Sequence, residues 1–470
     1  MIHTFVILAF HASMNSLLQR LGDFFAIQVR KVLPDSFVFA IILTLVTMGL
    51  ALGLTDTGAL ELMGQWIGGL YSPKILTFGF FMMMILCFGY TMGDSRVMRN
   101  FFHALSKRIH RPTQVYLVIT LSSLILNLIN WGLAPVTALF TVELCKRVKG
   151  VDFRLACAAL YSGMLVWHGG LSSSAAIMMA SESTASVFID AGLIEDVIPV
   201  TETLLHPLNI ALIGFTLFIL PMMILWIRPA YDPHFDAALR IQGEQDNEEV
   251  LDAATQEEES HPTWADRLNR AYIINIILAV LCVVGLVLSV QNKGFDLTAL
   301  TLLMLTGALL LQGSPIRFVH VMKDAIKGAS DIVVQFPLFG GIMGIFIGSG
   351  LAVIFADQLL SIGDGQSLPW LAFVCSSVVN LFIPSGGGEW LVLGPPLLEA
   401  AGRSGADIGK TIIAFAYGDS LTNLMNPFWT LTFLPIMGRL IKMETRDFMG
   451  YTVFLCLVFF VFESLIIWLV

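Results

Sequence analysis

Long apolar runs interrupted by short polar breaks form the main pattern of this chain. One run stops at 122–132, which contains Asn130-Trp131-Gly132, and another stops at 376–388, which contains Pro384-Ser385 and three glycines. A further polar break follows each of them, at 161–174 and at 417–427. Interrupted apolar segments at corresponding places in two halves indicate an inverted repeat whose breaks meet near the middle of a bilayer, as in secondary transporters.

The apolar runs predict an all-α polytopic membrane protein, because about 20 apolar residues in a helix cross the hydrocarbon core. We expect a first repeat at 1–228 and a second at 271–470, separated by an acidic cytoplasmic linker at 229–270. The first repeat is predicted to contain spans 36–54, 75–93 and 204–228, a hairpin at 113–145 and a broken transmembrane helix at 154–180. The second is predicted to contain spans 271–290, 297–312, 332–356 and 448–470, a hairpin at 369–401 and a broken helix at 410–440.

Basic residues at both ends of 113–145 predict that this stretch is a re-entrant hairpin. Arg111 precedes it and Lys146 follows it, and Lys and Arg accumulate on cytoplasmic loops. Both ends therefore lie inside, and the chain turns near Asn130. Non-helical backbone at this depth is tolerated only where it faces protein or water. The hairpin at 369–401 is expected to enter from the opposite face, which completes an inverted repeat with two re-entrant hairpins.

Composition supports a membrane protein and locates the charge. The chain is 56% hydrophobic and 13% charged, whereas soluble domains carry about a quarter charged residues. The net charge of −9 is accounted for by 230–267, where eleven acidic residues face two basic ones. This stretch is predicted to be a solvated linker, with an acidic docking segment as the alternative. Glu463 is expected at the interfacial end of its span, the six scattered cysteines are expected to fill the core, and either Met1 or Met14 could be the start.

The glycines after Ser385 predict a substrate site. A helix that restarts there directs free N–H groups into the break, and such an end attracts anions, so a small carboxylate fits. Close packing of small residues and helix capping are the structural alternatives. The residues expected to bind substrate are Ser172, Ser173, Ser174, Ser385, Gly386, Gly387, Gly388, Asn423 and Asn426.

Ionisable residues at the breaks predict a coupling site. His168, Glu389 and Asp419 are costly at membrane depth and commonly mark a proton pathway. We expect His168 and Glu389 to approach each other across the repeat axis, unless both face a wet vestibule. Asn130 and Asn380 are the candidate Na⁺ ligands, and the sequence does not separate Na⁺ from H⁺ coupling. No other metal, cofactor or nucleic acid is expected, because nucleotide, dinucleotide and zinc-protease motifs are missing from the sequence.

These motifs resemble the bacterial short-chain fatty acid transporter family of the ion-transporter superfamily. The resemblance implies a carrier, not an enzyme, for small monocarboxylates such as acetoacetate or butyrate. It also implies residence in the bacterial inner membrane, a homodimer, and elevator movement of a transport domain against a scaffold. The motifs that carry it are Leu33-Pro34-Asp35, Asn130-Trp131-Gly132, Trp167-His168-Gly169-Gly170, Pro384 to Trp390, and Ala416 to Asn423 with Pro427-Phe428-Trp429.

Two residues depart from the family pattern. The family has His where this chain has Glu389 and Gly where it has His168, so a histidine lost on one side and gained on the other could preserve a coupling pair. Asp419 stands where the family has Glu. The other functions to be tested are an anion channel, a carrier of a different anion such as a dicarboxylate, and an intramembrane hydrolase that uses Ser385 and His168.

Overall fold

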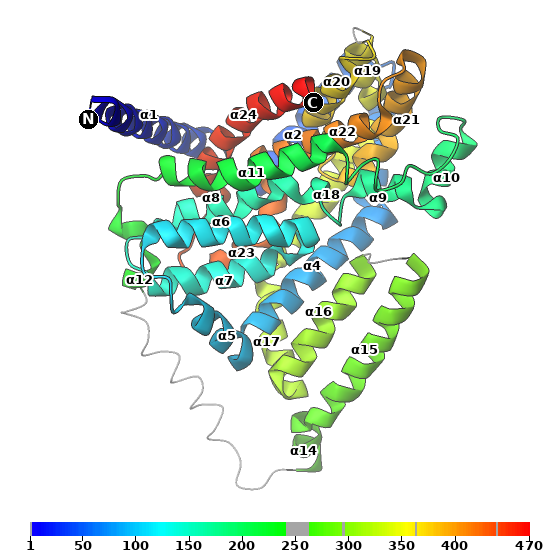
Figure 1. Ribbon diagram of the computed structural model, residues 1–470. Coiled ribbons are helices and arrows are strands. Elements are labelled where there is room, and N and C mark those ends of the chain that lie inside the picture. Colours follow the sequence, from blue (N-terminus) through cyan, green and yellow to red (C-terminus); the bar gives the residue numbers. More distant parts are fainter. Residues whose placement is uncertain (1, 241–262, 294–296, 362–363, 439) are drawn as a thin grey trace.

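The computed structural model describes residues 2–240, 263–293, 297–361, 364–438 and 440–470, and its ordered structure is helical (Figure 1). Within these ranges, the β structure consists of one isolated bridge, between Asp152 and Asp236. The prediction of an all-α multi-pass membrane protein is confirmed at this level.

Six helical segments of the described chain are long and apolar enough to cross a membrane. They are α2 (Ser36–Leu54), α3 with α4 (Ala59–Leu70 and Pro73–Gly93), α6 (Pro112–Ile129), α11 (Pro207–Trp226), α15 (Tyr272–Lys293) and α24 (Thr445–Leu469). The helices α17 (Pro315–Gly328) and α18 (Ser330–Gly348) meet at 49° and would form a seventh span if they cross together.

The predicted single span at 332–356 is wrong, because the chain is divided there. Helix α18 ends at Gly348 and α19 (Leu351–Leu360) begins after Gly350. Gly350 adopts φ 77°, a left-handed conformation that glycine reaches without the steric cost of a Cβ. A helix cannot continue through that residue, so the apolar run becomes two helices.

Two helix pairs occupy the residues predicted as hairpins. In the first, α6 is followed by the short 3₁₀ turn η1 (Trp131–Leu133) and by α7 (Ala134–Arg147). In the second, α20 (Leu368–Val379) is followed by α21 (Gly386–Ser404). Their placement as re-entrant elements in a bilayer stays a prediction.

The residues predicted as broken helices contain several short helices. The first of these segments consists of α8 (Phe153–Ser162), η2 (Gly163–Gly169) and α9 (Ser174–Ala180). The second consists of α22 (Ile408–Thr422), η5 (Asn423–Met425), η6 (Pro427–Thr432) and α23 (Leu434–Met437).

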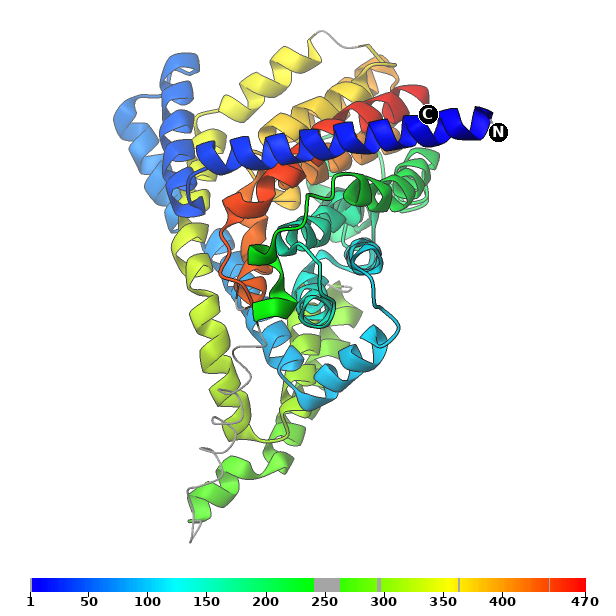
Figure 2. The same cartoon turned by 90° about the vertical axis from the view of Figure 1, so that its left-hand side faces the viewer.

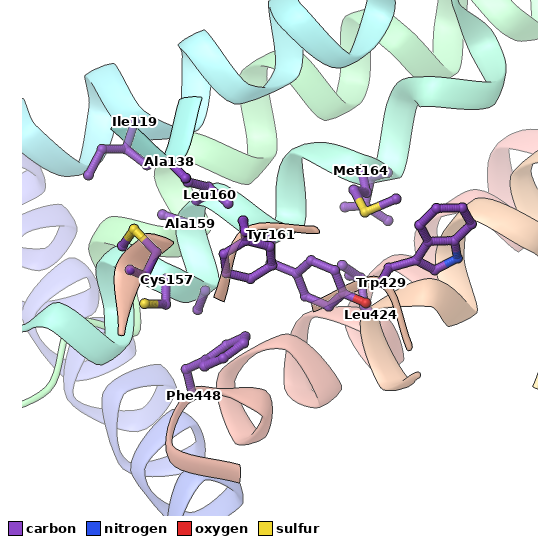
Figure 3. Packing of buried hydrophobic residues seen from close by; sticks show 14 of the residues in the cluster. Ile119, Ala138, Cys157, Ala159, Leu160, Tyr161, Met164, Leu424, Trp429 and Phe448 are labelled. Atoms are coloured by element: carbon purple, nitrogen blue, oxygen red, sulfur yellow. The ribbon is translucent and has the colours of Figure 1, made fainter. Parts of the chain in front are cut away.

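The broken segments pack against the hairpins and against each other. Helix α20 lies along α22, η2 packs between α6 and α22, and α9 contacts α21. Tyr161 at the end of α8 lies among Leu424 and Phe448 in a continuous apolar core (Figure 3). Its hydroxyl donates to the main-chain carbonyls of Asn423 at 2.6 Å and Asn426 at 2.7 Å. One buried tyrosine therefore joins the first broken segment to the second.

The N-terminal helix α1 (Ile2–Val32) lies along α24 (Figure 2). Gly450 permits this approach, because a Cβ there would overlap the backbone of Ala26. Arg30 Nε lies 3.1 Å from Asp447 Oδ1 at one end of the contact. The remaining helices are α5 (Arg96–Ser106), α10 (Glu182–Asp190), η3 (Pro233–Phe235), α12 (Ala237–Arg240), α14 (Trp264–Arg270) and α16 (Leu297–Gln312).

The start of the predicted acidic linker is docked on the helices. Asp236 is fully buried and accepts hydrogen bonds from Gly150 N at 2.7 Å and from the Tyr231 hydroxyl at 2.8 Å. The prediction of a solvated segment is therefore wrong for this part, since paired acceptors make burial of the carboxylate possible. Most of the acidic residues of 229–270 fall in 241–262, outside the described residues.

Candidate functional site

The glycines at the start of α21 lie against the first broken segment. The Cα of Gly386 faces the His168 imidazole: a methyl group on that Cα would lie 2.8 Å from Cε1 and nearer still to Nε2. A methyl group on Gly387 would lie 3.7 Å from Ser174 Cβ. The glycines therefore let η2 and the start of α9 approach the N-terminus of α21 closely. The breaks at 161–174 and 376–388, far apart in the sequence, therefore lie side by side in the structure.

Three ionisable side chains are buried at this place. His168 Nε2 lies 3.4 Å from Asp419 Oδ2, and both residues are at most 1% exposed. Glu389 is also fully buried, and its carboxyl lies within electrostatic range of the Asp419 carboxyl. Asp419 therefore links His168 to Glu389, two residues that the sequence predicted to meet directly.

The polar atoms of this cluster are poorly satisfied. None of the side-chain nitrogen and oxygen atoms of His168, Glu389 and Asp419 has a hydrogen-bond partner of good geometry among the described residues. The 3.4 Å approach of His168 to Asp419 is an electrostatic contact without the alignment of a hydrogen bond. Buried polar groups are normally paired, because an unpaired one costs about 1–3 kcal/mol. These unpaired atoms make the cluster a candidate place for binding a proton or a polar ligand.

Local structure explains how Glu389 is placed. Ser385 is extended and caps α21, with its hydroxyl accepting from Gly388 N at 3.4 Å. Glu389 N donates to Ser385 O at 2.7 Å, so the glutamate stands in the first helical turn. A carboxylate is favoured near the positive end of a helix dipole. Asp419 belongs to α22, whose residues 409 and 411–422 are all buried, and therefore faces protein on every side.

Asn380 connects the second hairpin to α22. Its Nδ2 lies 2.8 Å from Asp419 O, 3.0 Å from Thr422 Oγ1 and 2.9 Å from Asn423 Oδ1. Its own Oδ1 is buried and has no partner within the described chain. One amide oxygen thus remains for the predicted Na⁺ role. The described residues contain no group of three or more His, Cys, Asp or Glu that could hold a metal ion.

The Asn130 side chain stabilises the turn of the first predicted hairpin. It is extended, and its Oδ1 accepts from Gly132 N at 2.9 Å, which starts the turn η1. Trp131 N donates to Ser172 Oγ at 3.2 Å, so Ser172 holds the hairpin tip. Of the serines predicted to bind substrate in this break, Ser174 is the one found against Gly387, whereas the buried Ser173 hydroxyl has no partner among the described residues.

Asn423 and Asn426 are tied into the structure around α22. Asn423 accepts from Asn380 through its side chain, and Asn426 Oδ1 accepts from Phe428 N at 3.0 Å, as a helix cap does. The side-chain Nδ2 of each is buried without a described partner. These amides could still donate to a ligand, but their oxygens already have structural partners.

An apolar hollow next to Ser385 was not predicted. Its cavity volume is about 10 Å³, enough for roughly one water molecule. Its lining residues are Ile75, Phe78, Phe336, Phe339, Gly340, Met343, Pro384, Ser385 and Phe428. The aromatic residues of 332–356 looked like ordinary span residues in the sequence, and nothing in their spacing indicates that they converge with Phe78 and Phe428.

Comparison with known proteins identifies the family. Residues 17–470 match the family described as short chain fatty acid transporter. The chain belongs to the short-chain fatty acid transporter family. The transporter is 30% identical over 439 residues to a protein of Escherichia coli (strain K12) provisionally named a short-chain fatty acid transporter, with 92% of this chain and 96% of that protein covered. A protein of Haemophilus influenzae with the same name is 29% identical over 453 residues, with 93% and 96% covered.

Two solved structures resemble the transporter weakly. The YdaH transporter of Alcanivorax borkumensis is 15% identical, with a TM-score of 0.36, and covers 92% of this chain and 98% of its own. MtrF of Neisseria gonorrhoeae, from a class of antimetabolite efflux pumps, is 13% identical, with a TM-score of 0.34, and covers 92% and 95%. Family membership, not these likenesses, confirms that the protein is a multi-pass membrane transporter and not an enzyme.

Proposed function

We propose that this protein is a secondary active transporter of short-chain monocarboxylates, driven by a proton that binds the His168–Asp419–Glu389 cluster. The observation that carries the proposal is the meeting of this cluster with the N-terminus of α21 beside an apolar hollow. The names of its relatives support the substrate class. The bacterial inner membrane, the homodimer and the elevator movement implied by the resemblance remain parts of this proposal.

The N-terminus of α21 suits the carboxylate of the substrate. The first N–H groups of a helix have no carbonyl partner within the helix, and the dipole favours a negative charge there. Gly388 N already donates to Ser385 Oγ, so the N–H groups of Gly386 and Gly387, which carry no side chain, remain for the carboxylate. Ser174 lies next to Gly387 and can add a hydroxyl donor. A substrate carboxylate held there would lie about one helical turn, roughly 5 Å, from Glu389.

This short distance makes binding of the substrate carboxylate depend on whether Glu389 is protonated. Two negative charges about 5 Å apart repel by about 3 kcal/mol at an effective dielectric constant of ~20. Glu389 and Asp419 add to this repulsion when they are ionised. A proton bound by the cluster removes it, so proton and carboxylate strengthen each other's binding by the same factor. Mutual strengthening of this kind is what a symporter needs.

The apolar hollow would accept a short alkyl chain only when its aromatic walls move apart, because its cavity volume of about 10 Å³ holds roughly one water molecule. Aromatic walls remove such a chain from water at a gain of about 0.8 kcal/mol per methylene. Ser385 belongs to both the hollow and the cap of α21, so an alkyl chain in the hollow can end in a carboxylate at the helix. A second carboxylate would be placed among aromatic side chains, which argues against dicarboxylates.

The proposal predicts a definite pattern of transport in proteoliposomes that contain the purified protein. Straight-chain monocarboxylates and dicarboxylates of two to six carbons should be compared, with and without Na⁺, at two pH values. We expect saturable uptake and counter-transport of monocarboxylates, driven by an inward proton gradient. Current without saturation or counter-transport would indicate a channel. Uptake that needs Na⁺ and does not respond to the proton gradient would indicate that Na⁺, bound by oxygens near Asn380, drives transport. Exclusive uptake of dicarboxylates would contradict the substrate class.

Met343 should set the preferred chain length. It lines the hollow, and its Cε would lie 3.2 Å from a methyl group on Gly388, so it stands close to the α21 N-terminus. Met343→Ala should shift preference toward longer acids, and Met343→Phe should shift it toward acetate, by about three- to tenfold for each methylene, according to transfer energies of about 0.8 kcal/mol. Competition of unlabelled acids with radiolabelled butyrate measures this. Parallel losses for all chain lengths would show that the hollow does not hold the chain.

A further inference from the structure

Glu463 is a second buried carboxyl group, apart from the cluster at α21. It lies in α24, one of the candidate spans, and is fully buried. Neither of its carboxyl oxygens has a hydrogen-bond partner among the described residues. The sequence predicted an interfacial position at the end of a span, and the structure encloses the side chain in protein. An ionisable group buried at a membrane span, with no cation paired to it among the side chains that the structure describes, is costly in its charged form and is a candidate for function.

A polar path leads from Glu463 to His168. Helices α22 and α24 pack together, and Tyr417 of α22 lies within electrostatic range of Glu463, although no hydrogen bond joins the two side chains. The Tyr417 hydroxyl donates to Asn209 Oδ1 at 3.0 Å, and Asn209 Nδ2 donates to Gly169 O at 2.9 Å. Gly169 directly follows His168 in η2, and a methyl group on Gly169 would meet the Tyr417 hydroxyl at 2.6 Å. The path thus crosses from α24 through α22 and α11 to the backbone that carries His168.

Few titratable groups face this carboxyl. Tyr417 comes from α22 and Cys456 from α24 itself. Helices α11 and α20 also pack on α24, and neither contains Asp, Glu, His, Lys or Arg. Asp23 and Arg30 of α1 and Arg154 of α8 interact with Tyr451 or Asp447 at the other end of α24. Helix α1 also contains His3, His11, Arg20 and Lys31.

We propose that Glu463 is a second proton-binding site of the transport cycle, and that Tyr417 transmits its state to His168. The proton would come from water on the side of lower pH, form an O–H bond with the Glu463 carboxylate, and return to water on the other side when that bond breaks. When the Glu463 carboxyl is protonated, the Tyr417 hydroxyl keeps its hydrogen bond to Asn209, as in the structure. An ionised Glu463 carboxylate can only accept hydrogen bonds, and it competes with Asn209 for the Tyr417 hydroxyl. Loss of that bond weakens the hydrogen bond from Asn209 to Gly169.

The inference rests on the proposed proton-driven carboxylate transport, and Glu463→Gln tests it. Glutamine keeps the size of the side chain and cannot ionise. In proteoliposomes, we expect at least a tenfold loss of butyrate accumulation driven by a pH gradient. Butyrate binding and butyrate–butyrate exchange should stay within about twofold of the wild type, since neither requires net proton movement. Tyr417→Phe should lower accumulation in the same direction, and Glu463→Asp should restore part of it.

The control is Glu399→Gln, which makes the same change at a glutamate that is 60% exposed on α21. Unchanged accumulation in Glu463→Gln, or an equal loss of binding, exchange and accumulation, would overturn the inference and leave Glu463 a packing residue. The proposed function fails differently, because wild-type protein would then show no saturable carboxylate uptake. Wild-type uptake driven by Na⁺ alone would overturn the Glu463 inference while leaving carboxylate transport in place.

Discussion

Glu389→Gln should make butyrate binding nearly independent of pH and should abolish accumulation driven by a proton gradient. In the wild type, ionisation of the cluster should weaken binding by roughly a hundredfold, which corresponds to the estimated repulsion of about 3 kcal/mol. Glutamine removes the charge that faces the carboxylate, so affinity at high pH should rise toward that at low pH. Thermal shift with butyrate across pH, together with uptake under a pH gradient, measures both effects.

His168→Ala should act on the same site from the other side. Loss of the imidazole leaves Asp419 without the group that lies 3.4 Å from its carboxyl, so the proton should bind less well and accumulation should fall at least tenfold. His103→Ala is the matched control, because His103 is 53% exposed and lies outside the site. If Glu389→Gln and His168→Ala both keep the wild-type pH profile, the cluster does not couple transport to protons.

Gly386→Ala should lower transport at least tenfold, whereas Gly387→Ala should lower it much less. The new methyl group at Gly386 would overlap the His168 imidazole, which is enclosed by protein and cannot move away freely. His168 would be forced from Asp419, and the approach of η2 to α21 would open. Initial rates of butyrate uptake measure the loss, and thermal unfolding of the purified variants shows whether the fold survives.

Gly387→Ala is a stringent control because it adds the same methyl group one residue away. There the nearest atoms would lie at 3.7 Å, an ordinary van der Waals distance. Alanine also favours helices over glycine by about 0.5–1 kcal/mol, so this variant should not be less stable. Equal losses in both variants would mean that glycine is needed for backbone freedom or helix packing. No loss in Gly386→Ala would show that contact with His168 is dispensable.

Hydrogen bonds to local turns show which candidate residues are structural and which can bind a ligand, and residue type alone does not show this. Asn130, Ser172 and Asn426 have the polar side chains expected of a binding site, yet each holds a turn or a cap. Asn380 is likewise committed through its nitrogen, and its oxygen remains available. Polar residues at a helix break must first satisfy the broken backbone, and only those with spare hydrogen-bonding atoms can serve a ligand.

The sequence by itself determined the membrane class and the polar breaks at which α6, α8, α20 and α22 end. These are local properties: apolar length decides which runs can cross a bilayer, and Gly, Pro and Asn decide where a helix stops. The family also follows from the chain alone, since it is read from residues in order. Within the described residues, Gly350 divided a run that its apolar character predicted to be continuous.

The tertiary structure alone decided which breaks meet. It placed Asp419 between His168 and Glu389, set Ser174 against Gly387, and gathered Phe78, Phe336 and Phe428 into one hollow. It also buried Glu463 behind Tyr417. These contacts join residues tens to hundreds of positions apart. They depend on how helices pack in three dimensions, which a one-dimensional pattern of apolar and polar positions does not contain.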